Sequence, residues 1–362
     1  MPAASVAFAG LAALAVAMGI GRFAFTPILP MMQDDAGLSI AGGGWLASAN
    51  YAGYLAGALS AIRLPLSPVV AIRAGLVVVS ASTLAMAMHH GFAYWFALRA
   101  LAGVASAWVL VFVSILALGK RPQGGTLYAG VGAGIAAAGA VCLALMAVHA
   151  SSSAAWITLG AASFVMTALL WRVFDSGANA ASGATEAKLG SRYWLLVLCY
   201  GAFGFGYIIP ATFLPAMAKE VIADPVLFGW AWPVFGAAAA ASTFFAGFFP
   251  NHRKVWMVAT LIMALGVVVP LIIPGLSGIL VAAILIGGTF MVITMAGMQE
   301  ARRVAAESAR PLMAAMTSAF ALGQIAGPLW VSYKNSVVHA LLAAAAVLVL
   351  SAAVLLRNAD KT

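Results

Sequence analysis

Two arginines lie inside stretches of sequence that are otherwise apolar. Arg22 falls within GIGRFAFTPILPMM, residues 19–32, and Arg99 falls within the apolar run 92–118. A guanidinium is planar and charged, and its N–H groups match the geometry of a carboxylate. At the centre of a membrane helix a charge costs about 2.5–3.5 kcal/mol even on lenient insertion scales. Each arginine therefore needs a partner that offsets this cost, and an anionic ligand is one such partner.

For Arg22 we favour a bound ligand over the alternative, a structural arginine bonded to helix carbonyls, because charges inside membranes usually serve function. For Arg99 both interpretations stay open. The 9 acidic residues all fall in loops or at predicted helix ends, so no carboxylate lies in the middle of an apolar run. Two arginines inside predicted spans, without an acid in the middle of any span, favour an anionic organic solute over a cation.

The composition predicts that these arginines lie in a membrane. Of the 362 residues, 64% are hydrophobic and 7% are charged, and the mean hydropathy is +1.07. An ordinary soluble domain carries about 25% charged residues, so the solvent of this chain must be largely lipid. The net charge of +9 does not indicate a nucleic-acid partner, because no basic domain or aromatic–basic patch accompanies it.

The sequence offers no set of residues typical of a cofactor, a metal site or catalysis. Cys142 and Cys199 both lie in apolar runs and fit a packing role. A membrane enzyme would need a haem-ligating histidine pair, a nucleophile with its base, or a metal cluster, whereas the histidines here lie near the ends of runs. We therefore expect no cofactor and no enzymatic activity.

The apolar runs predict an all-α integral membrane protein with twelve transmembrane helices. A span needs about 20 apolar residues, and the runs between polar or Pro/Gly positions cover roughly 6–31, 41–62, 68–88, 92–118, 125–148, 153–173, 192–218, 226–249, 254–273, 276–298, 311–333 and 336–357. The polar segment 174–191 reads as a cytoplasmic linker. It separates two predicted six-helix bundles, residues 1–173 and 192–362.

The distribution of loop charges predicts the orientation. With the N-terminus in the cytoplasm, nearly all loop lysines and arginines fall on the cytoplasmic side, and only Lys219 and Lys334 fall opposite. The positive-inside rule then predicts a multi-pass protein of the cytoplasmic (inner) membrane with both termini cytoplasmic.

An internal repeat supports the two-bundle prediction. A shift of 185 positions, from 19 to 204, places residues 19–32 on GFGYIIPATFLPAM, residues 204–217, with a shared G-x-G…LP-x-M frame. Such a frame favours two parallel six-helix repeats related by an axis along the membrane normal. Arg22 falls on Tyr207, so we expect that the arginine is not needed to build the helix.

Local motifs point to a known family. Arg99, Gly103 and Ala107 match an R-x3-G-x3-A pattern in the fourth predicted helix, and GQIAGP at 323–328 contains a Gly-Pro pair in the eleventh. Together with the repeat and the linker, these features resemble the major facilitator superfamily over nearly the whole chain. GIGRFAFTPILPMM, LASANYAGYLAGAL (46–59) and GQIAGP more narrowly resemble its YbfB/YjiJ-type branch.

The resemblance implies a secondary active transporter that works by alternating access, as a monomer, with helices one, four, seven and ten around a central cavity. In-span polar residues there become candidates for binding a small organic solute, and a small-molecule site is typically ring-lined with few polar groups. We expect the substrate-binding residues to be Arg22, Phe25, Asn50, Tyr54, Arg99, Tyr207 and Gln324. For any single ring, ordinary core packing is the simpler explanation, and for Arg99 the family motif also fits gating or coupling.

Three acidic residues are the candidates for coupling transport to a proton or ion. Asp34 and Asp35 lie at the predicted outer mouth, and Glu300 lies at the inner end of the tenth helix. Facilitated diffusion or substrate exchange is equally compatible with the sequence. An efflux carrier for lipophilic or cationic compounds is the alternative within carriers, and a channel or a non-transporting membrane receptor is the alternative of another class.

Overall fold

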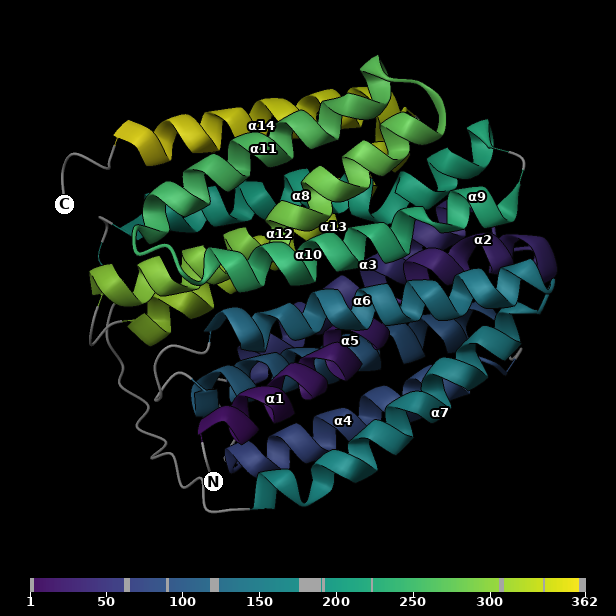
Figure 1. The fold of residues 1–362 in the computed structure, drawn as a ribbon, viewed down its shortest axis with the longest axis horizontal. Coiled ribbons are helices and arrows are strands. Elements are labelled where there is room, and N and C mark those ends of the chain that lie inside the picture. The colour runs from purple at the N-terminus through teal and green to yellow at the C-terminus, as the bar shows by residue number, and fades with distance from the viewer. Residues whose placement is uncertain are drawn as a thin grey trace.

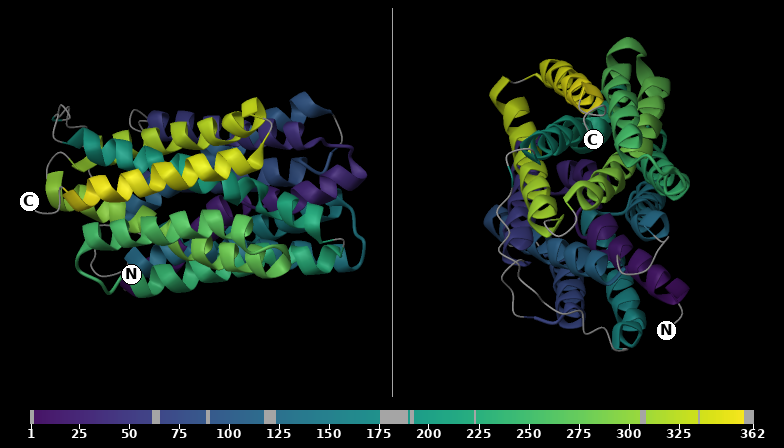
Figure 2. Two further views of the ribbon diagram at one scale, coloured as in Figure 1. Left: turned by 90° about the horizontal axis from the view of Figure 1, so that it is seen from above. Right: turned by 90° about the vertical axis from the view of Figure 1, so that its left-hand side faces the viewer.

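The chain folds as a bundle of long helices. The computed structural model describes residues 3–61, 66–88, 91–117, 124–175, 190, 193–222, 224–305, 309–334 and 336–357, and nearly all of this part of the chain is helical, without a strand (Figure 1). Most helices run lengthwise along the molecule, and the view along this direction shows them side by side (Figure 2). The expected all-α class is confirmed for these residues.

The helices follow one another with short connections. The first group contains α1 (Ala3–Leu14), the π-helical segment η1 (Ala15–Ile20), α2 (Phe25–Asp35), α3 (Ile40–Ala61), α4 (Pro68–Ala85), α5 (Phe92–Ala117), α6 (Gly124–Ala147) and α7 (Ser152–Trp171). After the short turn η2 (Val173–Asp175) come α8 (Trp194–Val221), α9 (Pro225–Gly229), α10 (Ala231–Ala246), α11 (His252–Ile272), α12 (Gly275–Ala305), α13 (Ala309–Lys334) and α14 (Val337–Arg357). Most of the predicted linker 174–191 lies outside the described residues.

Ten helical segments of the described chain are long and apolar enough to cross a membrane. The first of them, Ala7–Asp35, joins α1, η1 and α2. The helices α3 and α10 are not among the ten: α10 has 16 residues, and α3 interrupts its apolar residues with Asn50, Tyr51 and several glycines. The number twelve therefore stays a prediction, and the multi-pass membrane protein is confirmed.

The first membrane segment is broken where Arg22 lies. In η1 the amide of Gly21 donates to the carbonyl of Val16 at 2.9 Å, a π-helical bond, and residues 21–24 form a turn before α2. Pro27 has no N–H and cannot close the usual bond to the preceding turn. The repeat partner α8 is continuous through Tyr207. The two copies of the shared frame therefore differ in their local backbone here, and the helix that carries Tyr207 forms without an arginine.

The repeat is nevertheless visible in how the helices cross. A Cβ atom on Gly19 would lie 2.5 Å from Cα of Gly134 in α6, and a Cβ on Gly204 would lie 2.3 Å from the carbonyl oxygen of Phe320 in α13. The shift of 185 relates Gly19 to Gly204 and places Gly134 next to Phe320 in the second copy. Small residues at corresponding positions therefore let corresponding helices touch backbone to backbone.

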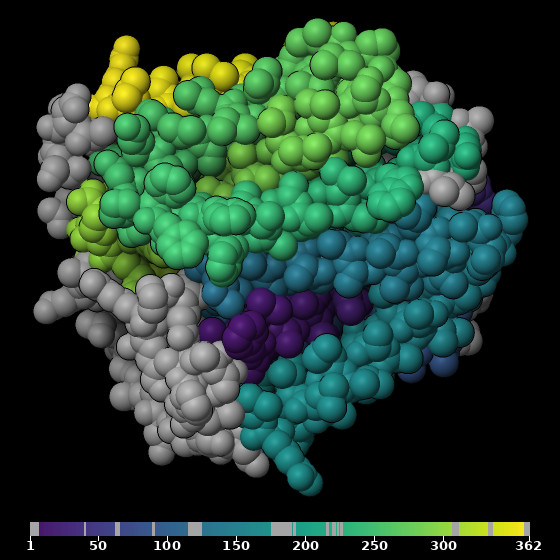
Figure 3. Space-filling model, in the orientation of Figure 1, coloured from purple at the N-terminus to yellow at the C-terminus, as the bar shows by residue number. Residues whose placement is uncertain are grey.

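Glycines also bring α6, from the first copy of the repeat, against α10, from the second copy. A Cβ on Gly132 would lie 2.3 Å from the amide nitrogen of Ala240, and one on Gly236 would lie 2.2 Å from that of Ala136. The two helices run side by side across the face of the molecule in Figure 3. A contact this close leaves no room between the N-terminal and C-terminal groups of helices along this line.

The glycine contacts predict that Gly53→Ala destabilises the protein. The new methyl group would lie 2.0 Å from the carbonyl oxygen of Ala100 in α5, and overpacking of this kind costs about 1–3 kcal/mol. Gly44→Ala is the matched control on the same helix, because a Cβ there meets nothing within 4 Å and alanine favours a helix by about 1 kcal/mol over glycine. The unfolding temperature of the purified variants should fall for Gly53→Ala and hold or rise for Gly44→Ala; equal temperatures would contradict the α3–α5 contact.

Candidate functional site

Arg22 is buried at the centre of the bundle, in the turn that breaks the first membrane segment. Its side chain is 2% exposed. The Nη2 group donates a hydrogen bond to Oε1 of Gln324 on α13. The guanidinium carbon lies 3.9 Å from the ring centre of Tyr54 and 5.3 Å from that of Tyr51, both on α3. The ring centre of Phe23 lies 5.5 Å away. Rings that face a cation stabilise its charge through their quadrupoles, so Arg22 is held by one amide and three rings.

Gln324 extends this contact to the repeat partner of Arg22. Its Nε2 group donates to the hydroxyl oxygen of Tyr207 on α8 at 2.9 Å, and both residues are fully buried. The two positions related by the internal repeat, Arg22 and Tyr207, therefore meet through one amide from α13. We call Arg22, Tyr51, Tyr54, Tyr207 and Gln324 the arginine cluster.

Arg22 has more donors than this arrangement uses. Its Nε and Nη1 atoms are buried, and among the described residues neither has a hydrogen-bond partner. A buried donor without an acceptor costs about 1–3 kcal/mol, and the face of the Tyr54 ring offsets only part of that cost. The unused N–H groups give Arg22 the capacity to bind an acceptor with more than one oxygen.

Arg99 is held differently, by the backbone of the broken segment. Its Nη1 donates to the carbonyl oxygen of Gly21 at 3.1 Å, and its Nη2 donates to that of Arg22 at 3.0 Å. Its guanidinium carbon lies 4.8 Å from the ring centre of Phe25. Asn50 donates from Nδ2 to the carbonyl oxygen of Arg99 at 2.9 Å. This geometry corresponds to the structural alternative for Arg99, an arginine that satisfies helix carbonyls.

The seven expected binding residues therefore lie in two adjoining groups. Arg22, Tyr54, Tyr207 and Gln324 belong to the arginine cluster, whereas Phe25 and Asn50 contact Arg99. The Phe25 ring also stacks on Trp156 of α7, with centres 6.5 Å apart. Each of these binding roles stays a prediction.

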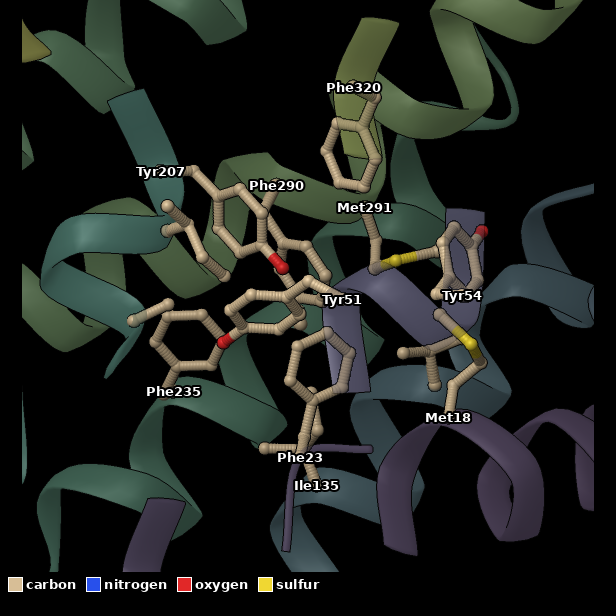
Figure 4. Close-up of a cluster of buried hydrophobic side chains, with 14 of the residues drawn as sticks. Met18, Phe23, Tyr51, Tyr54, Ile135, Tyr207, Phe235, Phe290, Met291 and Phe320 are labelled. Atoms are coloured by element: carbon tan, nitrogen blue, oxygen red, sulfur yellow. The ribbon is translucent and has the colours of Figure 1, made fainter. Parts of the chain in front are cut away.

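Several rings beside the cluster were not among the expected binding residues. Phe290 of α12 and Phe320 of α13 stack on the two sides of Tyr207, with ring centres 5.4 and 5.7 Å away and planes tilted by 9° and 8°. Phe23 meets Phe290 edge to face, with centres 5.8 Å apart. Figure 4 shows these rings converging on one volume with Met18 and Met291. The resemblance had pointed to helix ten as cavity-lining, and Phe290 lies on α12, which corresponds to it.

The three acidic coupling candidates lie at helix ends. Asp34 is exposed at the end of α2. The carboxylate of Asp35 accepts hydrogen bonds from the backbone amide and from the hydroxyl of Ser152, the latter at 2.8 Å, at the first residue of α7. Glu300 is fully buried and receives two bonds from Arg303, at 2.8 and 2.9 Å. Asp35 and Glu300 thus have structural partners, and a coupling role for any of the three stays a prediction.

Comparison with known families covers almost the entire chain. A family model described as "Uncharacterised MFS-type transporter YbfB" matches residues 14–356. The match spans both Arg22 and Gln324. Among curated proteins, none matches the chain. Within the described residues, no group of three or more His, Cys, Asp or Glu side chains is placed to hold a metal ion.

We predict that Arg99→Ala destabilises the protein more than Arg22→Met. Removing Arg99 leaves the buried carbonyls of Gly21 and Arg22 without these donors, at about 1–3 kcal/mol for each. Arg22→Met keeps an unbranched stem and removes a charge that is only partly satisfied, and it leaves one buried acceptor, Oε1 of Gln324, without its donor, against two for Arg99→Ala. Unfolding temperatures of the purified variants test this; an equal fall for both would contradict the division of roles.

We also predict that Asp35→Ala lowers stability without changing the pH dependence of transport. Asp35 accepts from the first turn of α7, and losing a cap of this kind costs about 1 kcal/mol. Ser152→Ala removes one of the same bonds, so the double variant should cost less than the sum of the singles. A lost pH dependence at unchanged stability would instead indicate coupling.

Proposed function

Because the chain belongs to the major facilitator superfamily, in the branch described as the uncharacterised MFS-type transporter YbfB, we propose that it carries a small organic anion across the membrane by alternating access. Membership makes it an MFS-type transporter with several membrane-spanning helices. The charge of the solute and the mechanism are the parts that we propose.

The observation that carries the proposal is the guanidinium of Arg22. It is buried among rings, it uses one N–H group on Gln324, and its Nε and Nη1 are without acceptors in the described part of the chain. The backbone break beside it is already satisfied by Arg99. A buried charge of which the fold uses only one N–H group is best explained by an anionic ligand.

Two features support alternating access. The arginine cluster joins side chains from the broken first segment, α3, α8 and α13, so it lies where the N-terminal and C-terminal groups of helices meet. The interrupted segment η1–α2 lines this site, as discontinuous helices do in other transporters. In our proposal two six-helix bundles, residues 1–173 and 192–362, rock about this site, and one chain is sufficient.

For the orientation we propose the inner membrane with both termini in the cytoplasm. The start of α1 and the end of α14 lie at the same end of the bundle (Figure 1). Arg302 and Arg303 occupy the last turn of α12, and Arg357 the last turn of α14. Basic residues at such ends follow the positive-inside rule.

Efflux of a lipophilic cation is the second candidate, because aromatic rings bind cations and the site holds many rings. A positively charged Arg22 at their centre opposes it. A channel would require an open path, whereas the residues of the arginine cluster are buried.

Transport in proteoliposomes tests the proposed function. A panel of carboxylates, inorganic phosphate and tetraphenylphosphonium is offered to the wild type, to Arg22→Gln and to Arg357→Gln, the control at the end of α14. We expect saturable uptake and counterflow of at least one anion, reduced 10-fold or more in Arg22→Gln, since a bond to a charged group is worth about 1.5–3 kcal/mol, and unchanged in Arg357→Gln.

Two results would contradict it. Uptake of the cation alone, equal in all three proteins, would favour the efflux carrier. Flux that does not saturate and shows no counterflow would favour a channel.

A further inference from the structure

We propose that the carboxamide of Gln324 stands in for the carboxylate of the substrate, and that the substrate is a monocarboxylate with a flat, unsaturated body. The inference rests on the proposed function, because it specifies the ligand of Arg22. Its basis is the bonding around Gln324 and the arrangement of rings beside it.

A carboxamide and a carboxylate have the same planar shape. In the structure Oε1 of Gln324 accepts from Arg22, and Nε2 donates to the hydroxyl oxygen of Tyr207 at 2.9 Å. A carboxylate in the same place would again accept from Arg22. Its second oxygen would accept from Tyr207, because a phenol hydroxyl is a donor as well as an acceptor and its hydrogen can rotate. The partners of Gln324 are therefore also the partners that a carboxylate needs.

Replacing the Gln324 carboxamide by a substrate carboxylate also gives Arg22 more hydrogen bonds. The amide oxygen takes up Nη2, while Nε and Nη1 have no acceptor among the described residues. A carboxylate binds a guanidinium through two parallel, charge-assisted bonds, which are about twice as strong as neutral ones. Gln324 is thus a weak internal ligand, and a carboxylate is the group able to displace it.

The charges nearby select a single negative group. Arg99 is the other buried arginine of the described chain, and both of its Nη groups donate to backbone carbonyls. The Nε of Arg99 is buried without an acceptor among the described residues, so a second carboxylate of the substrate would find one unpaired N–H there, and not the two that Arg22 offers. The buried acid of the described chain, Glu300, is bound to Arg303, so the ammonium of an amino acid would find no counter-ion. Both dicarboxylates and amino acids fit poorly.

The rings select a flat body. Phe290, Tyr207 and Phe320 are nearly parallel, with tilts of 9° and 8° between neighbours. A planar group that takes the place of one of these stacked neighbours keeps the offset stacking, which an aliphatic ring cannot do. In Figure 4, Met291 lies between these rings and Tyr54, and Met18 lies next to Tyr54 on the side of Phe23. Methionine adapts its shape readily, so these two side chains can give way to a ligand.

The first experiment measures benzoate binding to purified wild type, Gln324→Ala, Gln324→Met and Gln324→Glu by calorimetry. Removing the internal ligand should strengthen binding several-fold in Gln324→Ala, and Gln324→Met should bind at least as tightly as the wild type. Gln324→Glu places a carboxylate on Arg22, and we expect a higher unfolding temperature and binding weakened 10-fold or more. Weaker binding by both Gln324→Ala and Gln324→Met would overturn the inference, because Gln324 would then be a direct ligand of the substrate. Binding by Gln324→Ala and Gln324→Met alone tests the inference, whether or not Gln324→Glu folds.

The second experiment compares ligands on the wild type. We expect benzoate to bind at least 10-fold more tightly than cyclohexanecarboxylate, benzamide, phthalate or phenylalanine. Tighter binding of an aliphatic acid, a dicarboxylate or an amino acid, or no binding of benzoate, would overturn the flat monocarboxylate. If such a ligand still depends on Arg22, the proposed function stands without this inference; if no anion depends on Arg22, both fail.

Discussion

The bonds from Arg99 to the carbonyls of Gly21 and Arg22 are the interaction on which the site depends. A helix broken inside a membrane exposes carbonyl groups that water cannot satisfy, and each such group is expensive. A guanidinium from α5 supplies donors across 77–78 positions of sequence. Because these carbonyls are satisfied, the chain can turn at residues 21–24, and the side chain of Arg22 points to α3 and α13.

The two buried arginines therefore have different partners. Asn50 fixes the backbone of Arg99, and the Phe25 ring lies against its guanidinium. These partners of Arg99 all belong to the N-terminal helices, and its Nε has no acceptor in the described part of the chain. Arg22 instead reaches Gln324 of α13 and shares its environment with Tyr207 of α8. One charge serves the architecture within one group of helices, and the other lies where the two groups meet. Two Nη groups of Arg99 satisfy backbone carbonyls, whereas Arg22 has two buried donors without an acceptor among the described residues.

Much of this was accessible from the sequence, for a physical reason. Arg22 and Gln324 stand out because polar side chains are rare in lipid, and Tyr207 stands out because the repeat sets it on Arg22. The sequence could not decide between the two interpretations of Arg99, since its partners are backbone carbonyls that only the fold brings near. Phe290 and Phe320 carry no signal, because a ring in an apolar run looks the same whether it packs a core or lines a site. The break was hidden by the shared G-x-G…LP frame, although Pro27 falls on Thr212 in the second copy.

The identity of the residue facing Arg22 has consequences for a carrier. An aspartate or glutamate at position 324 would neutralise the guanidinium fully, and in a dry site a bond of that strength would resist every competing ligand. An apolar residue would leave the charge without any acceptor when the site is empty. A neutral amide lies between these extremes: it satisfies one N–H group and links α13 to the broken segment, and in our proposal it yields to an anion. A carrier must close without its substrate yet release it, and a ligand of intermediate strength inside the protein satisfies both demands.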